Sequence, residues 1–553
     1  MARSHFQGDH RGLAAAADGE FGRFGRMFGG LEGPEFDEGA LAALATSMIK
    51  DDAGQFFNVA DSDENVRLPA GYTYFGQFVD HDLTLDKTSI GDAEADPEAI
   101  SNFRTAALDL DCVYGNGPGG DVILYDEKYR FRLSSHRIGP APSGPNATRT
   151  QFDHRRDKDG VALIGDPRND ENTLVAQIHQ AFTVFHNRIL GTDALMNGVQ
   201  STSERFRRAA RLARWHYQWV VLHDYLKRIC QPEVYRDIVN PGGTPRLRLY
   251  PKPGDVAAYP YMPIEFAAAA YRFGHSMVRP SYALNAVVGT QQAPPPHTRV
   301  PIFRADTTNK LKDLRGFRRI PEHWGIDWSY FLELEGEAPD VQGGEGLLQP
   351  AYRIDTMLVD PLRLLVNPDL QGRKPIERNL AYLNLLRGSR LRLPTAEQVG
   401  QAMSVGSFPA ARFPMLTPEQ IWSAGSRNNA SFSDSTGDAG IDAARDARRP
   451  LLDSFGANTP LWYYVLREAE WYGTWDPGDT DDMPAAERGG NDKLGGHHLG
   501  PIGSTIVLES FLGLLLGDPG SFIHQAGWRP MAPIAPTGTD NFELKHLIHW
   551  ALG

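Results

Sequence analysis

Apolar residues recur at helical spacing over long stretches of this sequence. In residues 171–190, and again from residue 206 to 226, they fall every three or four positions, which is the period of an amphipathic α-helix. Ser201 and Glu204 form the pattern of a capping box in front of the second stretch. A third stretch runs from Ile264 to Val278 and stops before Pro280. Further helices are expected at residues 395–403, 417–423, 460–471, 503–516 and 542–551.

Strand patterns are few and short, and Val122–Tyr125 is the clearest of them. No internal repeat of fixed period is present. Long polar or proline-rich loops are expected at residues 293–297, 335–346, 425–450 and 476–500. The sequence therefore predicts a mainly α-helical fold with few short strands. We expect an N-terminal arm, residues 1–50, followed by one large catalytic domain, residues 51–553.

The composition excludes several classes of protein. There are 56 Lys and Arg against 69 Asp and Glu, a net charge of −13, so nucleic acid and anionic membrane surfaces are poor partners. The two cysteines, Cys112 and Cys230, are too few for a disulfide framework or a cysteine-rich metal site. No apolar leader precedes residue 11, and residues 505–516 are too short to span a bilayer. We expect a cytoplasmic protein, or one exported without an ordinary signal peptide.

A polar cluster interrupts the apolar stretch around residue 80. If residues 75–82 are helical, Gln77, Asp80 and His81 lie on one face, within a turn of one another. Such groups are costly to bury without partners. The cluster is therefore either a surface-facing turn or part of a metal site, since His and carboxylates both bind metals.

Residues 165–172 open the first long helix with a second group of charges. Pro167 and the neighbouring acids suit a helix start. In the simplest interpretation Asp166 caps the helix, Glu171 complements its dipole and Arg168 is solvated.

A third cluster combines residues from two distant segments. Arg272 and His275 lie three apart, and Gly274 leaves room beside the imidazole ring. One interpretation is that His275 is an axial ligand of haem iron, since a neutral imidazole that faces a cavity can serve as one. The other is that it is a core residue, which is more common for a lone His on a helix. Asn384 and Arg387 lie in an otherwise apolar helix end. A buried Asn needs partners, and the second ring nitrogen of a metal-bound His is a suitable one.

Taken in order, these segments resemble the animal-type haem peroxidases of the peroxidase–cyclooxygenase superfamily. The resemblance extends from about residue 70 to about residue 530 and suggests a simple, microbial-type member. Seven segments carry it: 76–82, 105–115, 168–171, 271–275, 383–384, 517–521 and 527–530.

The resemblance implies haem b between a distal and a proximal helix. It makes His81 the distal acid–base group, Arg168 the distal charge-stabilising group and Gln77 a hydrogen-bonding neighbour of distal water or a small anion. It makes His275 the iron ligand, with Asn384 accepting its N–H and Arg272 pairing a haem propionate. We count Arg387 among the cofactor-binding residues as well. The chemistry is consistent, because an imidazole can move the proton that peroxide cleavage requires and a guanidinium can stabilise the departing oxygen.

The resemblance also places a calcium loop at residues 105–115. Thr105, Asp109 and Asp111 alternate, so their oxygens can converge on one side of an extended loop. With Asp82 and the Ala107 carbonyl they would form an oxygen cage of the kind that calcium prefers. Without the resemblance, this segment is typical of an ordinary edge strand.

Related peroxidases form ester bonds between carboxylates and haem methyl groups. The resemblance assigns this role to Asp80 and Glu171. One branch adds a third bond through a Met directly after the Glu, but here that position is Asn172, so at most two links are expected.

The expected function is reduction of hydrogen peroxide with oxidation of a small donor, such as a phenol, halide or metabolite, through oxidised haem. One alternative is a fatty-acid oxygenase of the same superfamily. Its radical Tyr would stand three residues before the proximal His, where this chain has Arg272, with Tyr271 one step away. A metal-dependent hydrolase built on residues 80–82 with His179 and His186 lacks the paired His spacing of such enzymes. A haem protein without turnover is the third alternative.

Overall fold

The computed structural model describes most of the 553-residue chain. The described residues are 24–50, 64–85, 102, 104–139, 151–240, 243–250, 260–285, 288, 299–305, 312–334, 348–366, 370, 372–405, 408–423, 439–474, 495–535 and 541–553. The expected loops at 293–297 and 335–346 lie outside them, as do most of residues 425–450 and 476–500.

The protein is mainly helical, as predicted. The α-helices are α1 (Glu38–Ser47), α2 (Gly71–Leu83), α3 (Asp111–Tyr114), α4 (Gly117–Gly120), α5 (Thr173–Gly191), α6 (Asp193–Met196), α7 (Thr202–Val220), α8 (Leu226–Ile229), α9 (Pro232–Val239), α10 (Ile264–Ala267), α11 (Leu380–Arg390), α12 (Ala396–Ser404), α13 (Pro418–Trp422), α14 (Ala439–Arg448), α15 (Leu451–Phe455), α16 (Leu461–Tyr472), α17 (Pro501–Gly517) and α18 (Leu544–Leu552). A π-helical turn, η4 (Val221–Tyr225), joins α7 to α8. The shorter 3₁₀ segments are η2 (Val122–Leu124), η3 (Pro167–Asp170), η5 (Ala270–His275), η7 (Trp328–Tyr330), η8 (Asp360–Arg363), η10 (Ile376–Arg378), η11 (Pro409–Arg412) and η14 (Phe522–His524).

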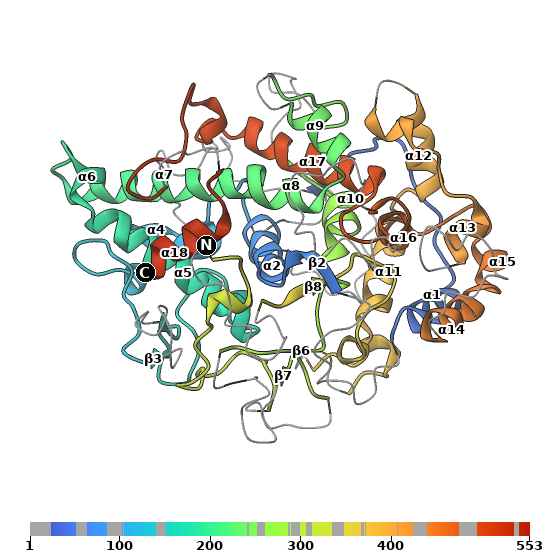
Figure 1. Ribbon diagram of the computed structural model, residues 1–553, viewed down its shortest axis with the longest axis horizontal. Helices are drawn as coiled ribbons and strands as arrows, with labels where there is room; N and C mark the ends of the chain where they lie inside the picture. The colour runs from blue at the N-terminus through green and yellow to red at the C-terminus, as the bar shows by residue number, and fades with distance from the viewer. Residues whose placement is uncertain are drawn as a thin grey trace.

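Helix α2 lies at the centre of the molecule (Figure 1). It packs against α5, which in turn packs against α7 and α18. On the other side, α2 meets η5, and η5 packs against α16 and α17. Helix α1, within the expected N-terminal arm, packs against α11, α14 and α15. The arm's boundary at residue 50 stays a prediction.

In the part of the chain that the structure describes, the strands form four two-stranded sheets. Strand β1 (Phe24–Gly25) pairs in parallel with β5 (Met262–Pro263). Three pairs are antiparallel: β2 (Glu64–Pro69) with β8 (Pro350–Tyr352), β3 (Arg137–Ile138) with β4 (Gln151–Phe152), and β6 (Ser281–Tyr282) with β7 (Val300–Pro301).

Two predicted elements were wrong in kind. The helix expected from Ile264 to Val278 is broken after α10, because Ala269 leaves the helical region (φ −135°, ψ −78°) and the chain continues as the 3₁₀ segment η5. The strand expected at Val122–Tyr125 begins instead with a 3₁₀ turn in which Val122 and Ile123 are exposed. The predicted helices at 395–403, 417–423, 460–471, 503–516 and 542–551 are confirmed within one or two residues.

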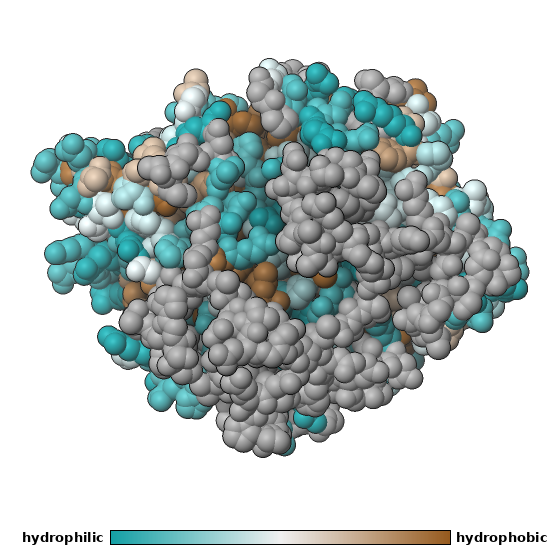
Figure 2. Space-filling model, in the orientation of Figure 1, coloured by the Kyte–Doolittle hydropathy of each residue, from teal (hydrophilic) through white to brown (hydrophobic). Residues whose placement is uncertain are grey.

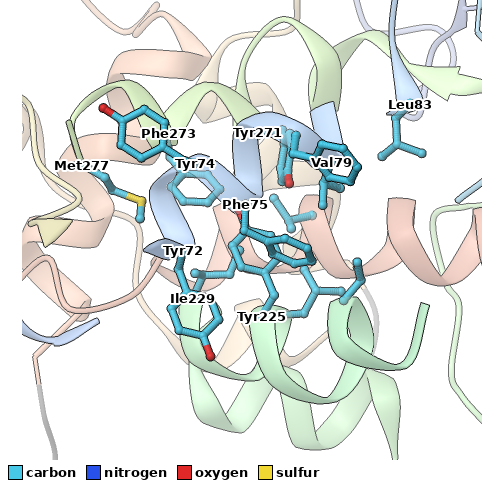
Figure 3. Close-up of a cluster of buried hydrophobic side chains, with 14 of the residues drawn as sticks. Tyr72, Tyr74, Phe75, Val79, Leu83, Tyr225, Ile229, Tyr271, Phe273 and Met277 are labelled. Carbon is cyan, nitrogen blue, oxygen red and sulfur yellow. The ribbon is translucent and has the colours of Figure 1, made fainter. Parts of the chain in front are cut away.

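Aromatic side chains surround α2 in the core. Phe75, Val79, Tyr225 and Tyr271 lie close together in Figure 3. The ring of Phe75 meets that of Tyr225 edge to face, with centroids 5.5 Å apart. Gly76 permits this packing, because a Cβ at that position would collide with the Tyr225 hydroxyl. The core therefore holds α2 rigidly from the side opposite its polar residues.

Buried glutamates join distant segments by accepting backbone N–H groups. Glu468 accepts from Ile502 and Gly503 at the start of α17, and Glu509 accepts from residues 248–250. Glu265 accepts from Met27 and Phe28. Burial raises the pKa of all three carboxyl groups, that of Glu468 to about 8.

The visible face of the described chain is mostly hydrophilic, with small hydrophobic areas between polar residues (Figure 2). In the part of the chain that the structure describes, no helix combines the length and the apolarity needed to cross a bilayer.

Candidate active site

The second half of α2 carries four of the predicted site residues. Gln77 and Asp80 are half-buried, whereas His81 is 4% and Asp82 0% exposed. The helix ends at Leu83, and the backbone N–H of the following residue, Thr84, donates to the Asp80 carbonyl over 2.9 Å. The predicted helical arrangement of this cluster is confirmed.

His81 has a different partner on each ring nitrogen. Its Nδ1 lies 2.8 Å from Oδ1 of Asn169, and its Nε2 lies 3.6 Å from Oε1 of Glu171. Burial, with the nearby charge of Arg168, lowers the pKa of His81 to about 4. The enclosed ring is therefore uncharged at pH 7 and can accept a proton.

Arg168 reaches α2 from η3. Its guanidinium donates to the carbonyls of His81 (3.0 Å) and Thr84 and pairs with Asp166 (2.8 Å). Asp166 also accepts from the backbone N–H of Arg168, so it caps the 3₁₀ segment η3 and not the long helix α5 that the sequence suggested, whose cap is Asn172. Burial alone would raise the pKa of Asp166, but Arg168 and Arg104 hold it well below its usual range. Arg168 is therefore an oriented cation at the end of the distal helix.

Glu171 lies beside both His81 and Gln77. Its carboxylate accepts from the Gln77 amide, whose oxygen in turn accepts from Asn172 over 3.1 Å. The side chain is 35% exposed, and its enclosure, with the charges of Asp166 and Asp80, raises the pKa of Glu171 to about 7. Asn172 caps α5 by accepting from Leu174 and Val175, which is why this helix begins at Thr173.

The proximal cluster is assembled by η5 and α11. In a 3₁₀ helix residues three apart align, so Arg272 and His275 share a face. Nδ1 of His275 lies 2.8 Å from Nδ2 of Asn384, which is fully buried. Burial, then the charge of Arg272, lowers the pKa of His275 to about 3, so its ring is neutral and can donate a lone pair to a metal. Arg387, one turn after Asn384 on α11, is half-buried.

Arg272 and His275 share the side-chain amide of Asn384. Arg272 donates to its Oδ1 over 2.8 Å and to the Ala267 carbonyl over 2.9 Å. The predicted pair of His275 and Asn384 is thus in contact, but the amide nitrogen faces the ring. An Asn384 that accepts from an iron-bound His275 needs the opposite amide orientation, which would release Arg272 for another acceptor.

The helix of the distal cluster, α2, contacts the segment of the proximal cluster, η5. The hydroxyl of Tyr271 donates to the Gly76 carbonyl over 3.2 Å and so joins η5 to α2 (Figure 3). Open space surrounds Gly274, where an added Cβ would meet nothing within 4 Å. A neutral imidazole on one side and an imidazole, a guanidinium and carboxylates on the other suit an iron porphyrin.

Behind the distal helix, three buried carboxylates converge. Ligand atoms of Asp82, Asp109 and Asp111 all lie within 4.8 Å of one another, and in the described chain no other group of three His, Cys, Asp or Glu does so. Burial, then the charges of Asp109 and Asp111, raises the pKa of Asp82 well above its usual range. The predicted Thr105 hydroxyl donates to Asp109 over 2.9 Å, and Ala107 is buried in the same loop. A hard divalent cation would relieve this repulsion.

An ion-pair chain links this carboxylate cluster to the distal arginine. Arg104 lies 3.4 Å from Asp111, and its Nε donates to Asp166 over 3.0 Å. Asp166 is also the partner of Arg168. Sequence reasoning did not single out Arg104, although a cation between acidic residues was a visible signal.

Sequence reasoning also assigned no role to Asn169 and His154. Asn169 contacts His81 and His179, and its carbonyl accepts from His154. His186 contacts Tyr114 instead. Among the described residues, the histidines of the hydrolase alternative therefore do not form a metal site with residues 80–82.

Comparisons with known proteins agree with this arrangement. The family model described as animal haem peroxidase matches residues 65–314. Thyroid peroxidase of Rattus norvegicus is 25% identical over 205 residues, which are 34% of this chain and 20% of the relative. The Homo sapiens protein is 26% identical over 198 residues, with the same shares covered. The chain thus matches about a fifth of the length of these curated relatives.

Two solved structures share the fold. Peroxidase A from Dictyostelium discoideum has a TM-score of 0.54 at 16% identity, covering 94% of this chain and 90% of its own. The fatty acid alpha-dioxygenase of Arabidopsis thaliana has a TM-score of 0.51 at 13% identity, covering 94% and 74%. The two likenesses show that the chain has the fold of these structures. In sequence, residues 65–314 resemble the animal haem peroxidases of the peroxidase–cyclooxygenase superfamily.

Proposed function

We propose that this protein is a haem peroxidase that reduces hydrogen peroxide and oxidises a small donor. The observation that carries the proposal is the arrangement of His81. Its Nδ1 is engaged by Asn169, while its Nε2 faces Glu171.

His81 and Arg168 have separate tasks in this reaction, proton transfer and charge stabilisation. His81, neutral at pH 7, takes a proton from one peroxide oxygen and delivers it to the other, which leaves as water. Arg168 stabilises the negative charge on the departing oxygen. Gln77 orients peroxide or water beside His81. Bound haem would supply the two electrons that cleave the O–O bond.

The proximal residues would hold this haem. His275 would bind iron through Nε2, and Asn384 would accept its Nδ1 proton after reorientation of the amide. Arg272, released from Asn384, and Arg387 would pair with propionates. Asp80 and Glu171 are the carboxylates proposed to form ester links to haem methyl groups. Calcium is proposed at Asp82, Thr105, Ala107, Asp109 and Asp111.

A fatty-acid oxygenase is the second candidate, because an alpha-dioxygenase shares the fold. The position three residues before His275 holds Arg272, whose guanidinium is bound to Asn384. Tyr271 is buried, and its hydroxyl donates to the Gly76 carbonyl. Oxygen uptake with a long-chain fatty acid, lost in Tyr271→Phe, would favour the oxygenase.

Stopped-flow absorbance of the haem protein with peroxide tests the proposal. His81→Ala and Arg168→Ala should keep haem but react with peroxide on the order of 10²–10⁴-fold more slowly. The control His524→Ala removes an exposed imidazole and should react like wild type. Wild-type rates in both distal variants, or no Soret band in the pure protein, would contradict the proposal.

A further inference from the structure

Behind His81 lies a second layer of polar side chains that the proposed reaction does not use. Asn169, His154, His179 and Gln180 are all buried. The Asn169 amide stands between two imidazoles: its Oδ1 lies 2.8 Å from Nδ1 of His81, and its Nδ2 lies 3.0 Å from Nδ1 of His179.

These contacts are polarised, because an amide oxygen only accepts and an amide NH₂ only donates. Nδ1 of His81 must therefore carry a proton, which leaves its Nε2 with a free lone pair. Nδ1 of His179 must be unprotonated, so that ring carries its proton on Nε2. His179 also lines a small pocket with Arg132 and Arg155.

The backbone of Asn169 is fixed independently of its side chain. Nε2 of His154 donates to the Asn169 carbonyl over 3.0 Å, and Nδ1 of His154 accepts from Gln180 over 2.6 Å. The Asn169 N–H donates to the Asp166 carbonyl over 3.1 Å. The His154 and His179 rings meet edge to face, with centroids 5.1 Å apart. Asn169 therefore has little freedom to move, and the orientation of its amide depends on the acceptor that His179 provides.

We propose that Asn169 is a positioning residue that holds His81 in the Nδ1-protonated tautomer, and that His179 sets the orientation of the Asn169 amide. Only this tautomer presents an unprotonated Nε2 on the side of Glu171. The consequence for catalysis rests on the proposed peroxidase function, whereas the tautomer itself does not.

The tautomer can be measured by ¹⁵N NMR of protein labelled at histidine, with the His81 signals assigned by their loss in His81→Gln. Haem-containing protein is studied in its diamagnetic ferrous carbon monoxide form. Wild type should show a protonated Nδ1 and an unprotonated Nε2 at His81. Asn169→Asp keeps an acceptor and should preserve this pattern. Asn169→Leu and His179→Leu should each produce a mixed or inverted tautomer of His81. His179→Leu would do so although His179 is connected to His81 only through the Asn169 amide.

The peroxide reaction gives a second, separate readout. Asn169→Leu should slow it on the order of 10²-fold, and Asn169→Asp should restore it to within about tenfold of wild type. An Nε2-protonated His81 in wild type, or an unchanged tautomer in both leucine variants, overturns the inference even if the protein is an active peroxidase. The expected tautomers in a protein that does not react with peroxide uphold the inference and refute the proposed function.

Discussion

Replacing Glu468 by Gln should change how the stability of the protein depends on pH. Glu468 lies on α16, is 2% exposed, and accepts N–H groups of Ile502 (2.9 and 3.1 Å) and Gly503 (3.2 Å). It thereby fixes the start of α17 to α16. Gly500 must lack a side chain here, because an added Cβ would collide with the Glu468 carboxylate. Helix α16 also supports the proximal segment, since Trp462 donates to the Arg272 carbonyl over 3.2 Å.

The magnitude follows from the two protonation states. Burial raises the pKa of Glu468 from 4.5 to about 8 in the folded protein. Between these values the unfolded chain has lost the proton that the folded chain keeps, so the free energy of unfolding falls as pH rises. The slope is about 1.4 kcal/mol per pH unit, or about 5 kcal/mol over the whole interval. Glu468→Gln has no proton to release at this position. Its free energy of unfolding, relative to that of wild type, should therefore increase with pH by the same slope.

Urea unfolding of both proteins between about pH 5 and about pH 8 measures this difference. Other buried carboxyl groups titrate in both proteins, so their contributions cancel in the difference between the two free energies of unfolding. Glu127→Gln, at an exposed position, controls for the introduction of an amide. Its free energy of unfolding should depend on pH in the same way as that of wild type. A difference between Glu468→Gln and wild type that does not change with pH would refute the reasoning.

Three further predictions concern the cofactor and the cation. His275→Ala should lose most of its haem, because no other protein–iron bond is expected; a wild-type Soret band in the pure variant would remove His275 as the ligand. Asp109→Asn should lose bound calcium and melt at a lower temperature, whereas Asp159→Asn, at an exposed carboxylate, should not; metal analysis without calcium in wild type would contradict the site. Small additions of peroxide should increase the fraction of haem that stays attached to the protein under denaturing mass spectrometry. Asp80→Val should lose one haem–protein link and Glu171→Gln the other. Haem that always dissociates from the unfolded protein would show that neither carboxylate forms an ester bond to it.

The sequence predicted those parts of the site in which the partners are close along the chain. Gln77, Asp80 and His81 lie within one helical turn, and Asp166 caps the segment that carries Arg168. Periodicity is enough for such contacts. It failed at η5, where a helical pattern of small residues is broken at Ala269 in a segment that packs against α16 and α17.

Contacts between distant segments could not be predicted in the same way. Asn169 lies 88 positions from His81, and His154 lies 15 positions before Asn169. Nothing in the local pattern of either residue reveals that the fold buries them together. The low pKa of His81 has the same origin, because burial of the ring depends on elements from several parts of the chain.

An ion-pair chain runs from Asp111 through Arg104 and Asp166 to Arg168. It connects the proposed cation site to the distal pocket. If occupancy of the carboxylate cluster changes how tightly a small anion binds beside Arg168, the anion must change the affinity for the cation by the same factor. Cation affinity would then report on the distal pocket without any measurement on the haem.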